Sequence, residues 1–161
     1  MLDLGAVQHM TIGPTEDYTA IREILFHPKV FHSRSVADHV RPEEYRFPNG
    51  LYLLARDEEK PIGFFYFTAV NPILYEVHCA FLPEAWGPKT TQAAEAGLLW
   101  LSIHTKCRML MALVPAFNKP AKAYLERLGA EYQGHIPRGA QKNGKRVPEM
   151  IFSLEVPNGS A

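Results

Sequence analysis

The feature that most constrains the fold is a strand–helix–strand unit in the second half of the chain. Residues 73–82 and 107–114 have the composition of strands, and residues 90–104 between them have the periodicity of a helix. The apolar stripe of that helix is formed by Ala94, Leu98 and Leu101. A helical crossover joins parallel strands, so both strands should lie parallel in one sheet. The run at 107–114 is almost continuously apolar, which predicts a strand buried on both faces.

Hairpin signals on both sides of this unit predict antiparallel strands. The predicted strands outside the unit are residues 6–13, 50–56, 61–70, 131–136 and 147–156. The polar segment 57–60 is expected to turn the chain between two of them, and Asn143-Gly144 is a turn dipeptide between the last two. The sheet should therefore combine parallel and antiparallel pairs.

Three further helices complete the predicted order of elements. Residues 16–26 are expected to form a helix with Thr15 as its N-cap, and a short helix is expected at residues 36–40. Residues 118–128 form the third, with Gly129 placed where a helix-ending glycine belongs. The resulting order, β-α(α)-β-β-β-α-β-α-β-β, indicates an α/β (α+β) fold, a mixed sheet with helices on both faces.

Length and composition indicate one globular domain. A chain of 161 residues suits one core, and 47% apolar with 21% charged residues is an ordinary balance. The 17 basic and 17 acidic residues balance, which argues against nucleic acid or an anionic membrane as the main partner. The first residues have no signal-peptide pattern and no apolar run has membrane-spanning length, so a cytoplasmic location is expected. Cys79 and Cys107 lie in apolar runs and are expected to be packed thiols rather than a disulfide.

Two segments carry a resemblance to a known family. Residues 76–87 are Glu-Val-His-Cys-Ala-Phe-Leu-Pro-Glu-Ala-Trp-Gly, and residues 114–129 are Val-Pro-Ala-Phe-Asn-Lys-Pro-Ala-Lys-Ala-Tyr-Leu-Glu-Arg-Leu-Gly. The first is similar to the fourth strand and following loop of GNAT acetyltransferases, and the second resembles their Asn-x-x-Ala/Ser helix that ends in Leu-Gly-Phe. The branch that it resembles most is that of the ribosomal-protein N-terminal acetyltransferases, which has phage-encoded relatives. The resemblance covers residues 50–156 well and the first fifty residues by element order alone.

The resemblance implies the GNAT acyl-CoA N-acyltransferase fold, a splayed mixed β-sheet in one domain over residues 1–161. Residues 6–49 would form the acceptor side, 50–114 the central strands and cofactor loop, and 115–156 the C-terminal helix and hairpin. The implied activity is direct transfer of an acetyl group from acetyl-CoA to a primary amine, on a protein N-terminus, a lysine or a small molecule. A monomer or a homodimer is expected. The alternative is a non-catalytic GNAT-fold binding or assembly module.

The loop before the long helix departs from the family pattern. GNAT members bind the pyrophosphate of coenzyme A with main-chain N–H groups of an Arg/Gln-x-x-Gly-x-Gly/Ala loop at a helix N-terminus. Here Trp86 takes the Arg/Gln position and Gly87 follows it, while Lys89 and Thr91 take the glycine positions. In one interpretation Lys89 supplies a charge to phosphate and Thr90 or Thr91 caps the helix. In the other, the loop no longer fits pyrophosphate and the domain has no catalytic activity.

Three further residues are implied in cofactor binding. Cys79 and Phe81 would present main-chain groups to pantetheine where the fourth strand splays from the fifth. Both side chains could at the same time be ordinary core residues. Asn118 would contact the cofactor arm, or would act only as the N-cap of its helix.

The candidate catalytic groups lie on the fourth strand. Acyl transfer needs a neutral amine, so a base is expected. Glu76 matches the glutamate of the N-terminal acetyltransferase pattern, and Tyr75 falls where histone-type members place theirs. Strand alternation puts these two on opposite faces, with His78 as a third candidate on the face of Glu76, and the sequence leaves open which face meets the cleft. Tyr124 lies one residue before the position of the family's usual acid, which is Leu125 here, and is predicted to be a core tyrosine.

Three histidines, His27, His32 and His39, fall in the acceptor-side segment. Their spacings of five and seven residues match no helical pair of metal ligands. No metal site is therefore predicted, and these side chains are expected on the surface or in the acceptor groove.

Overall fold

Seven strands form one sheet in the computed structural model, which describes residues 10–31 and 41–157. The strands, in the sheet order β1-β2-β3-β4-β5-β7-β6, are β1 Met10–Pro14, β2 Leu51–Asp57, β3 Lys60–Ala69, β4 Leu74–Phe81, β5 Met109–Pro115, β6 Glu131–Lys142 and β7 Lys145–Glu155. The helices are α2 Tyr18–Leu25, α3 Pro28–Phe31, α4 Pro88–His104 and α5 Lys119–Arg127, with 3₁₀ turns η2 Pro42–Glu44 and η3 Pro83–Ala85. This order agrees with the predicted one, although residues 6–9 and the helix predicted at 36–40 lie outside the described residues.

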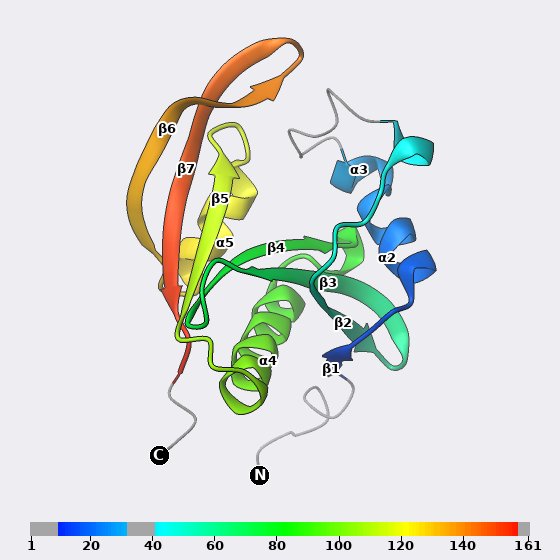
Figure 1. Cartoon of the computed structure of the whole chain (residues 1–161). Coiled ribbons are helices and arrows are strands. Elements are labelled where there is room, and N and C mark those ends of the chain that lie inside the picture. The colour runs from blue at the N-terminus through cyan, green and yellow to red at the C-terminus, as the bar shows by residue number, and fades with distance from the viewer. Residues whose placement is uncertain (1–9, 32–40, 158–161) are drawn as a thin grey trace.

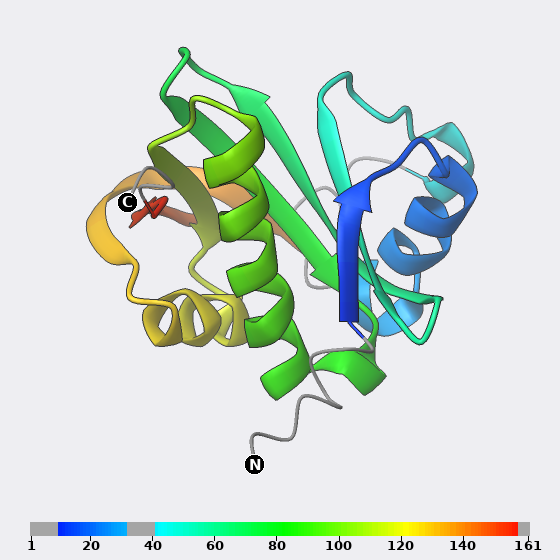
Figure 2. The same cartoon turned by 90° about the horizontal axis from the view of Figure 1, so that it is seen from below.

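Helices cover both faces of the sheet (Figures 1 and 2). The side chains of β2 alternate, so that Leu53 and Ala55 pack in the core beneath α4 while Tyr52 and Leu54 pack against α2. Tyr124 brings α5 into the α4 core, which puts α4 and α5 on one face and α2 on the other. No helix in the described part of the chain is long and apolar enough to cross a membrane.

The predicted parallel pair is formed by β4 and β5, and it is short. Its ladder contains the pairs Leu74–Met109, Tyr75–Leu110 and Glu76–Met111. From Val77 onward, β4 continues along β3, whereas β5 continues along β7 (Figure 1). The sheet therefore splays between β4 and β5, as the GNAT resemblance implies.

The structure corrects several local predictions. Strand β5 alternates between buried and half-buried residues instead of being buried on both faces, since α5 packs on only one of its faces. The N-cap of α2 is Asp17, whose side chain accepts the Ala20 N–H at 3.1 Å, and not Thr15. Helix α4 begins at Pro88, before its predicted start. The β6–β7 hairpin is longer than predicted, because an irregular register between Ile136 and Ala140 lets the polar segment join the ladder.

Backbone geometry confirms two predicted chain reversals, the turn between β6 and β7 and the end of α5. Asn143 and Gly144 have φ values of 53° and 76°, as a two-residue hairpin turn requires. Gly129 follows α5 with φ of 85°, and the Ala130 N–H donates to the Leu125 carbonyl at 3.0 Å. This left-handed glycine ends α5 and directs the chain into β6.

Candidate active site

A cavity of about 400 Å³ lies where β4 and β5 separate. Helices α4 and α5 line it from one face of the sheet, through residues that include Leu98 and Tyr124. From the other face it is lined by residues that include Tyr66 and His78. The cavity therefore extends through the sheet, and its volume is in the range of small-molecule sites.

The main chain of β4 turns alternate residues toward this opening. The Leu82 N–H donates to the Ile62 carbonyl of β3 at 2.8 Å. In an antiparallel pair every second residue bonds to the neighbouring strand, so the main-chain groups of Phe81 and Cys79 point away from β3. The Phe81 carbonyl accepts a hydrogen bond from the indole N–H of Trp86 at 2.9 Å. The Phe81 ring is a buried core side chain, whereas Cys79 is half-buried and lines the cavity.

The first turn of α4 faces open space. The helix begins at the N-cap Gly87, which has φ of 107° and makes no side-chain cap hydrogen bond. A β-carbon added at Gly87 would meet no atom within 4 Å. The prediction that Thr90 or Thr91 caps this helix is wrong, because the Thr90 hydroxyl is buried and donates to the Gly87 carbonyl at 2.7 Å. The positive end of the helix is thus accessible to an anion.

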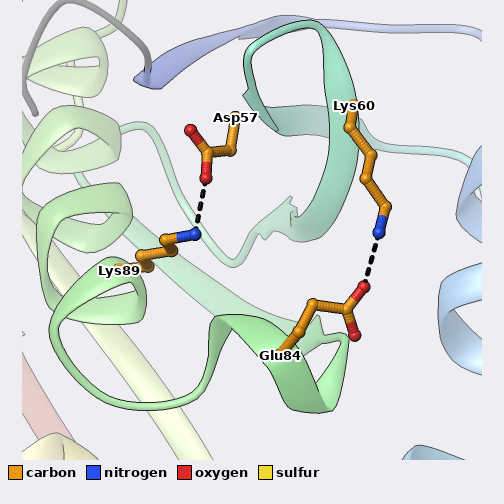
Figure 3. Close-up of polar contacts among 4 residues, drawn as sticks. All are labelled: Asp57, Lys60, Glu84 and Lys89. Carbon is orange, nitrogen blue, oxygen red and sulfur yellow. Dashed lines mark hydrogen bonds and ion pairs between the residues drawn. The ribbon is translucent and has the colours of Figure 1, made fainter.

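Two ion pairs flank this turn (Figure 3). Lys89 Nζ lies 2.6 Å from Asp57 Oδ2, and Lys60 Nζ lies 2.7 Å from Glu84 Oε1. The hydrogen bond to Asp57 raises the pKa of Lys89. Both pairs are at the surface, so their side chains can change partners at little cost.

Asn118 and Tyr124 hold α5 in place beside the cavity. Asn118 Oδ1 accepts the Ala121 N–H at 3.2 Å as an N-cap, and Asn118 also lines the cavity. The Tyr124 hydroxyl donates to the Thr90 carbonyl at 2.7 Å and joins α5 to the first turn of α4. Burial raises the pKa of Tyr124, which agrees with the predicted core tyrosine.

The candidate bases on β4 point to opposite faces. Tyr75 packs into the core beneath α4. Glu76 and His78 lie on the α2 face, where His78 Nε2 is 2.9 Å from Glu76 Oε1 and the His78 ring stacks on Tyr66 with centroids 5.8 Å apart. Since His78 lines the cavity, it connects Glu76 to that space.

Glu149 on β7 also lines the cavity, although no local sequence pattern marks it as a site residue. Met150 and Phe152 pack with α5, so strand alternation puts Glu149 on the α2 face with Glu76. Its Oε2 atom is buried and has no hydrogen-bond partner among the described residues. Burial, with a smaller contribution from the charge of Glu76, raises the pKa of Glu149. A buried carboxyl of this kind in a cavity is typical of functional sites.

Aromatic rings line the α2 side of the cavity. We call the following four residues the aromatic wall: Tyr45, Phe47, Tyr52 and Tyr66. Successive ring centroids along the wall are 5.2, 6.4 and 4.7 Å apart. The Tyr52 and Tyr66 hydroxyls donate to the carbonyls of Pro48 and Asn49, each at 2.8 Å. The wall therefore presents ring surface to the cavity while these two hydroxyls are used by the main chain.

The two cysteines differ in their surroundings. Both thiols are free. Cys107 is buried, as predicted, and burial raises its pKa. Cys79 is half-buried because it borders the cavity, but it also packs against the core beneath α4, so both cysteines are packed free thiols as predicted.

The histidines of the acceptor-side segment are only partly described. His27 Nδ1 accepts a main-chain hydrogen bond from Lys29 at 3.2 Å. His32 and His39 lie outside the described residues. Within residues 10–31 and 41–157, no group of three or more His, Cys, Asp or Glu side chains is placed to hold a metal ion.

Comparisons with known proteins identify the fold. No family model and no curated protein matches the sequence. The structure matches a spermidine N-acetyltransferase from Vibrio cholerae, solved with CoA and spermine, with TM-score 0.75, 14% identity, and 92% and 96% of the two chains covered. It matches an acetyltransferase from Salmonella typhimurium that modifies the N-terminal serine of a 50S ribosomal subunit protein with TM-score 0.76, 12% identity, and 92% and 96% covered.

A GNAT-family acetyltransferase from Bacillus anthracis matches in the same way, with TM-score 0.73, 16% identity, and 91% and 95% of the two chains covered. Each match extends over nearly the whole of both chains. The chain therefore has the fold of the GNAT acetyltransferases.

Proposed function

We propose that this chain is an N-acetyltransferase that transfers an acetyl group from acetyl-CoA to a primary amine. The observation that carries the proposal is the cavity between β4 and β5, which is lined from both faces of the sheet. Two ligands could enter from opposite faces and meet within it. The presence of CoA in the Vibrio cholerae structure supports the choice of cofactor.

The residues on the α4 face fit coenzyme A. The main-chain N–H groups of Gly87 and Lys89, at the positive end of α4, would hold the diphosphate. The main chain of Cys79 would pair with the pantetheine arm, and Asn118 would lie beside that arm. Bound there, acetyl-CoA would supply the acetyl group as a thioester.

The other residues of the predicted cofactor set fall into two groups. We assign no cofactor contact to the Thr90 hydroxyl, which donates to Gly87, or to the Phe81 carbonyl, which accepts from Trp86. Trp86 itself is 55% exposed beside the turn and, with Thr91, stays a candidate contact.

Lys89 would have to leave Asp57 to reach a phosphate. Their ion pair is at the surface, where such pairs contribute little to stability. Ammonium–carboxylate and ammonium–phosphate hydrogen bonds are both charge-assisted, so a phosphate contact would replace the contact with Asp57 that is lost. We therefore propose that Lys89 exchanges Asp57 for the diphosphate when the cofactor binds.

On the α2 face, the acceptor amine would lie between Glu149 and the Glu76–His78 pair. An ammonium must lose a proton before its nitrogen can attack an acyl carbon. Glu149 would receive this proton, since its raised pKa makes it a better base than an ordinary carboxylate. Glu76 would orient His78, and we favour it over Tyr75 because Tyr75 packs in the core. Transfer would be direct, because both ligands would share one cavity. The amine nitrogen would bond to the acetyl carbon, the C–S bond would break, and CoA would leave as a thiol that takes up the second proton of the nitrogen.

The test is steady-state acetylation of simple primary amines by the wild type and Glu149→Gln. The variant should lose about 100-fold or more in kcat/KM, the usual contribution of a general base. The acid limb of its pH–rate profile should also flatten. Glu155→Gln is the matched control, because it makes the same change at an exposed residue on the same strand. A Glu149→Gln enzyme with wild-type rate and pH profile would remove Glu149 from the mechanism.

The second candidate function is a non-catalytic binding module. The carboxylates of Asp57, Glu58 and Glu84 all act on Lys89, and this negative surface disfavours the phosphates of coenzyme A. Calorimetric titration with acetyl-CoA separates the two functions. Absence of heat at millimolar ligand, together with an unchanged unfolding temperature, would favour the binding module.

A further inference from the structure

We propose that the acceptor is a single primary ammonium carried two or three carbon atoms from a ring-sized apolar group, and that it is not a polyamine. This inference rests on the proposed function, because it names the class of amine that the same site would take. It is carried by the aromatic wall and by the distribution of charge around it.

One continuous set of contacts leads from the carboxylates to the aromatic wall. His78 pairs with Glu76 and stacks on Tyr66, and Tyr66 packs on Tyr52 with centroids 4.7 Å apart. Phe47 lies next along the wall, 6.4 Å from Tyr52. An ammonium held at the carboxylates would therefore have ring surface beside it, at the distance of a short alkyl linker.

The wall is fixed in place before any ligand binds. Arg22 donates to the carbonyls of Pro42 and Tyr45 at 2.9 and 3.3 Å, and its guanidinium carbon lies 5.0 Å from the Phe47 ring centroid. The hydroxyl of Tyr52 is bonded to the main chain. A preformed apolar surface binds a matching group without a large ordering cost, so it selects by shape and apolar area.

The charges near the wall suit one ammonium and not two. Apart from Cys79 and tyrosines, the titratable groups among the described lining residues are His78 and Glu149. Arg22 places a positive charge against Phe47. A second ammonium on the wall would meet this charge, and the described lining residues offer no carboxylate besides Glu149 to balance it, which separates this site from one built for spermidine.

The experiment compares kcat/KM for four amines with acetyl-CoA: 2-phenylethylamine, ethanolamine, spermidine and a peptide amide that begins with Phe. The first two share the aminoethyl unit and differ in a phenyl or a hydroxyl group. We expect 2-phenylethylamine to exceed ethanolamine and spermidine by roughly 100-fold, because the phenyl group buries apolar area on the wall. Comparing kcat/KM for the peptide amide and 2-phenylethylamine shows whether the ammonium and ring are better supplied by a peptide N-terminus or by a small amine.

Variants locate the preference on the wall. Phe47→Ala should lower kcat/KM for 2-phenylethylamine by about tenfold or more and leave ethanolamine within about twofold. Phe47→Leu removes the ring but keeps most of the side-chain volume, and it replaces Phe47→Ala in the test if the alanine variant does not fold. The control is Tyr132→Ala, which removes an exposed aromatic residue on β6.

The outcomes separate this inference from the proposed function. If no amine is acetylated and acetyl-CoA does not bind, the proposed function fails. If amines are acetylated but ethanolamine or spermidine equals 2-phenylethylamine, or if Phe47→Ala affects all amines equally, the proposed function stands and this inference is overturned.

Discussion

The two sides of the cavity are built by different means. On the α2 side, hydrogen bonds from Tyr52, Tyr66 and Arg22 to main-chain carbonyls fix the rings of the aromatic wall. On the α4 side, the residues around the helix start are exposed, and their charges form pairs between long side chains. One side offers a fixed shape, and the other offers charges that can be rearranged.

This difference indicates how the two ligands would be selected. A fixed apolar surface discriminates by size and shape, because its own groups do not adjust to a poor match. Exposed ion pairs discriminate weakly and depend on salt, but they can exchange one anion for another. We therefore expect the acceptor to be chosen on the α2 side, and the common cofactor to be held through main-chain donors and mobile charges.

The strongest test of this comparison is Arg22→Ala. The variant loses two hydrogen bonds to carbonyls and the contact with Phe47, so it should lose about 2 kcal/mol of unfolding free energy. The KM for 2-phenylethylamine should rise about tenfold, since the wall is no longer held. The Kd of acetyl-CoA should stay within about twofold, because the helix start is built independently. Urea unfolding, kinetics and calorimetry measure the three quantities.

A matched control for this variant is Arg127→Ala. Arg127 also stacks on a ring, that of Tyr124 at 5.8 Å, but it lies on α5. Its removal should leave the KM for the amine unchanged. If Arg22→Ala changed the acetyl-CoA Kd as much as the amine KM, the two sides would be coupled and the comparison would break.

A smaller effect is expected from Asp57→Asn at the other side. The substitution releases Lys89 and removes one negative charge beside the helix start, so acetyl-CoA should bind roughly threefold more tightly at low salt. Amine KM should not change. Calorimetric titration at two salt concentrations measures the effect.

The control for that substitution is Glu84→Gln, which removes one charge from the neighbouring Lys60 pair. It should have the smaller effect, because Lys60 lies outside the first turn of α4. Weaker binding of acetyl-CoA to Asp57→Asn would contradict the role proposed for Lys89.

The smallest effect concerns stability and pH. Burial raises the pKa of Glu149 above its ordinary value of 4.5 in the folded state. The folded chain thus holds this proton to higher pH than the unfolded chain, so its stability falls as pH rises from 4.5 through the raised pKa. Glu149→Gln avoids this loss and should unfold at a slightly higher temperature at neutral pH, with no advantage below pH 4.5. The measurement is the unfolding temperature of the wild type, Glu149→Gln and the control Glu155→Gln as a function of pH. A constant difference between the wild type and Glu149→Gln at every pH would refute the raised pKa assigned to Glu149.

The sequence predicts the structural features that are determined by residues close together in the chain. The cap at Asn118, the glycine end at Gly129 and the parallel pairing of β4 with β5 all follow from local patterns and one crossover rule. The sequence also predicts a loop before the long helix, where η3 lies, although α4 begins at Pro88, earlier than predicted. Such features depend on residues within one or two elements.

Features assembled from distant residues could not be predicted in the same way. Glu149 reaches the cavity because β7 pairs with β5 and points it to the α2 face. Arg22 and Tyr45 meet across more than twenty residues through a main-chain carbonyl, which has no side-chain signature. The face occupied by Glu76 depends on where α2 packs, and alternation alone gives only the two possibilities.

The short ladder between β4 and β5 has a consequence for the cohesion of the whole molecule. Three residue pairs connect a half-sheet of four strands to a half-sheet of three. Any ligand in the opening would contact both half-sheets, at the place where β4 and β5 make no ladder hydrogen bonds to each other. Ligand binding would then stabilise the contact between the two half-sheets, and in the free protein local opening would be easiest between β4 and β5, where the ligands bind.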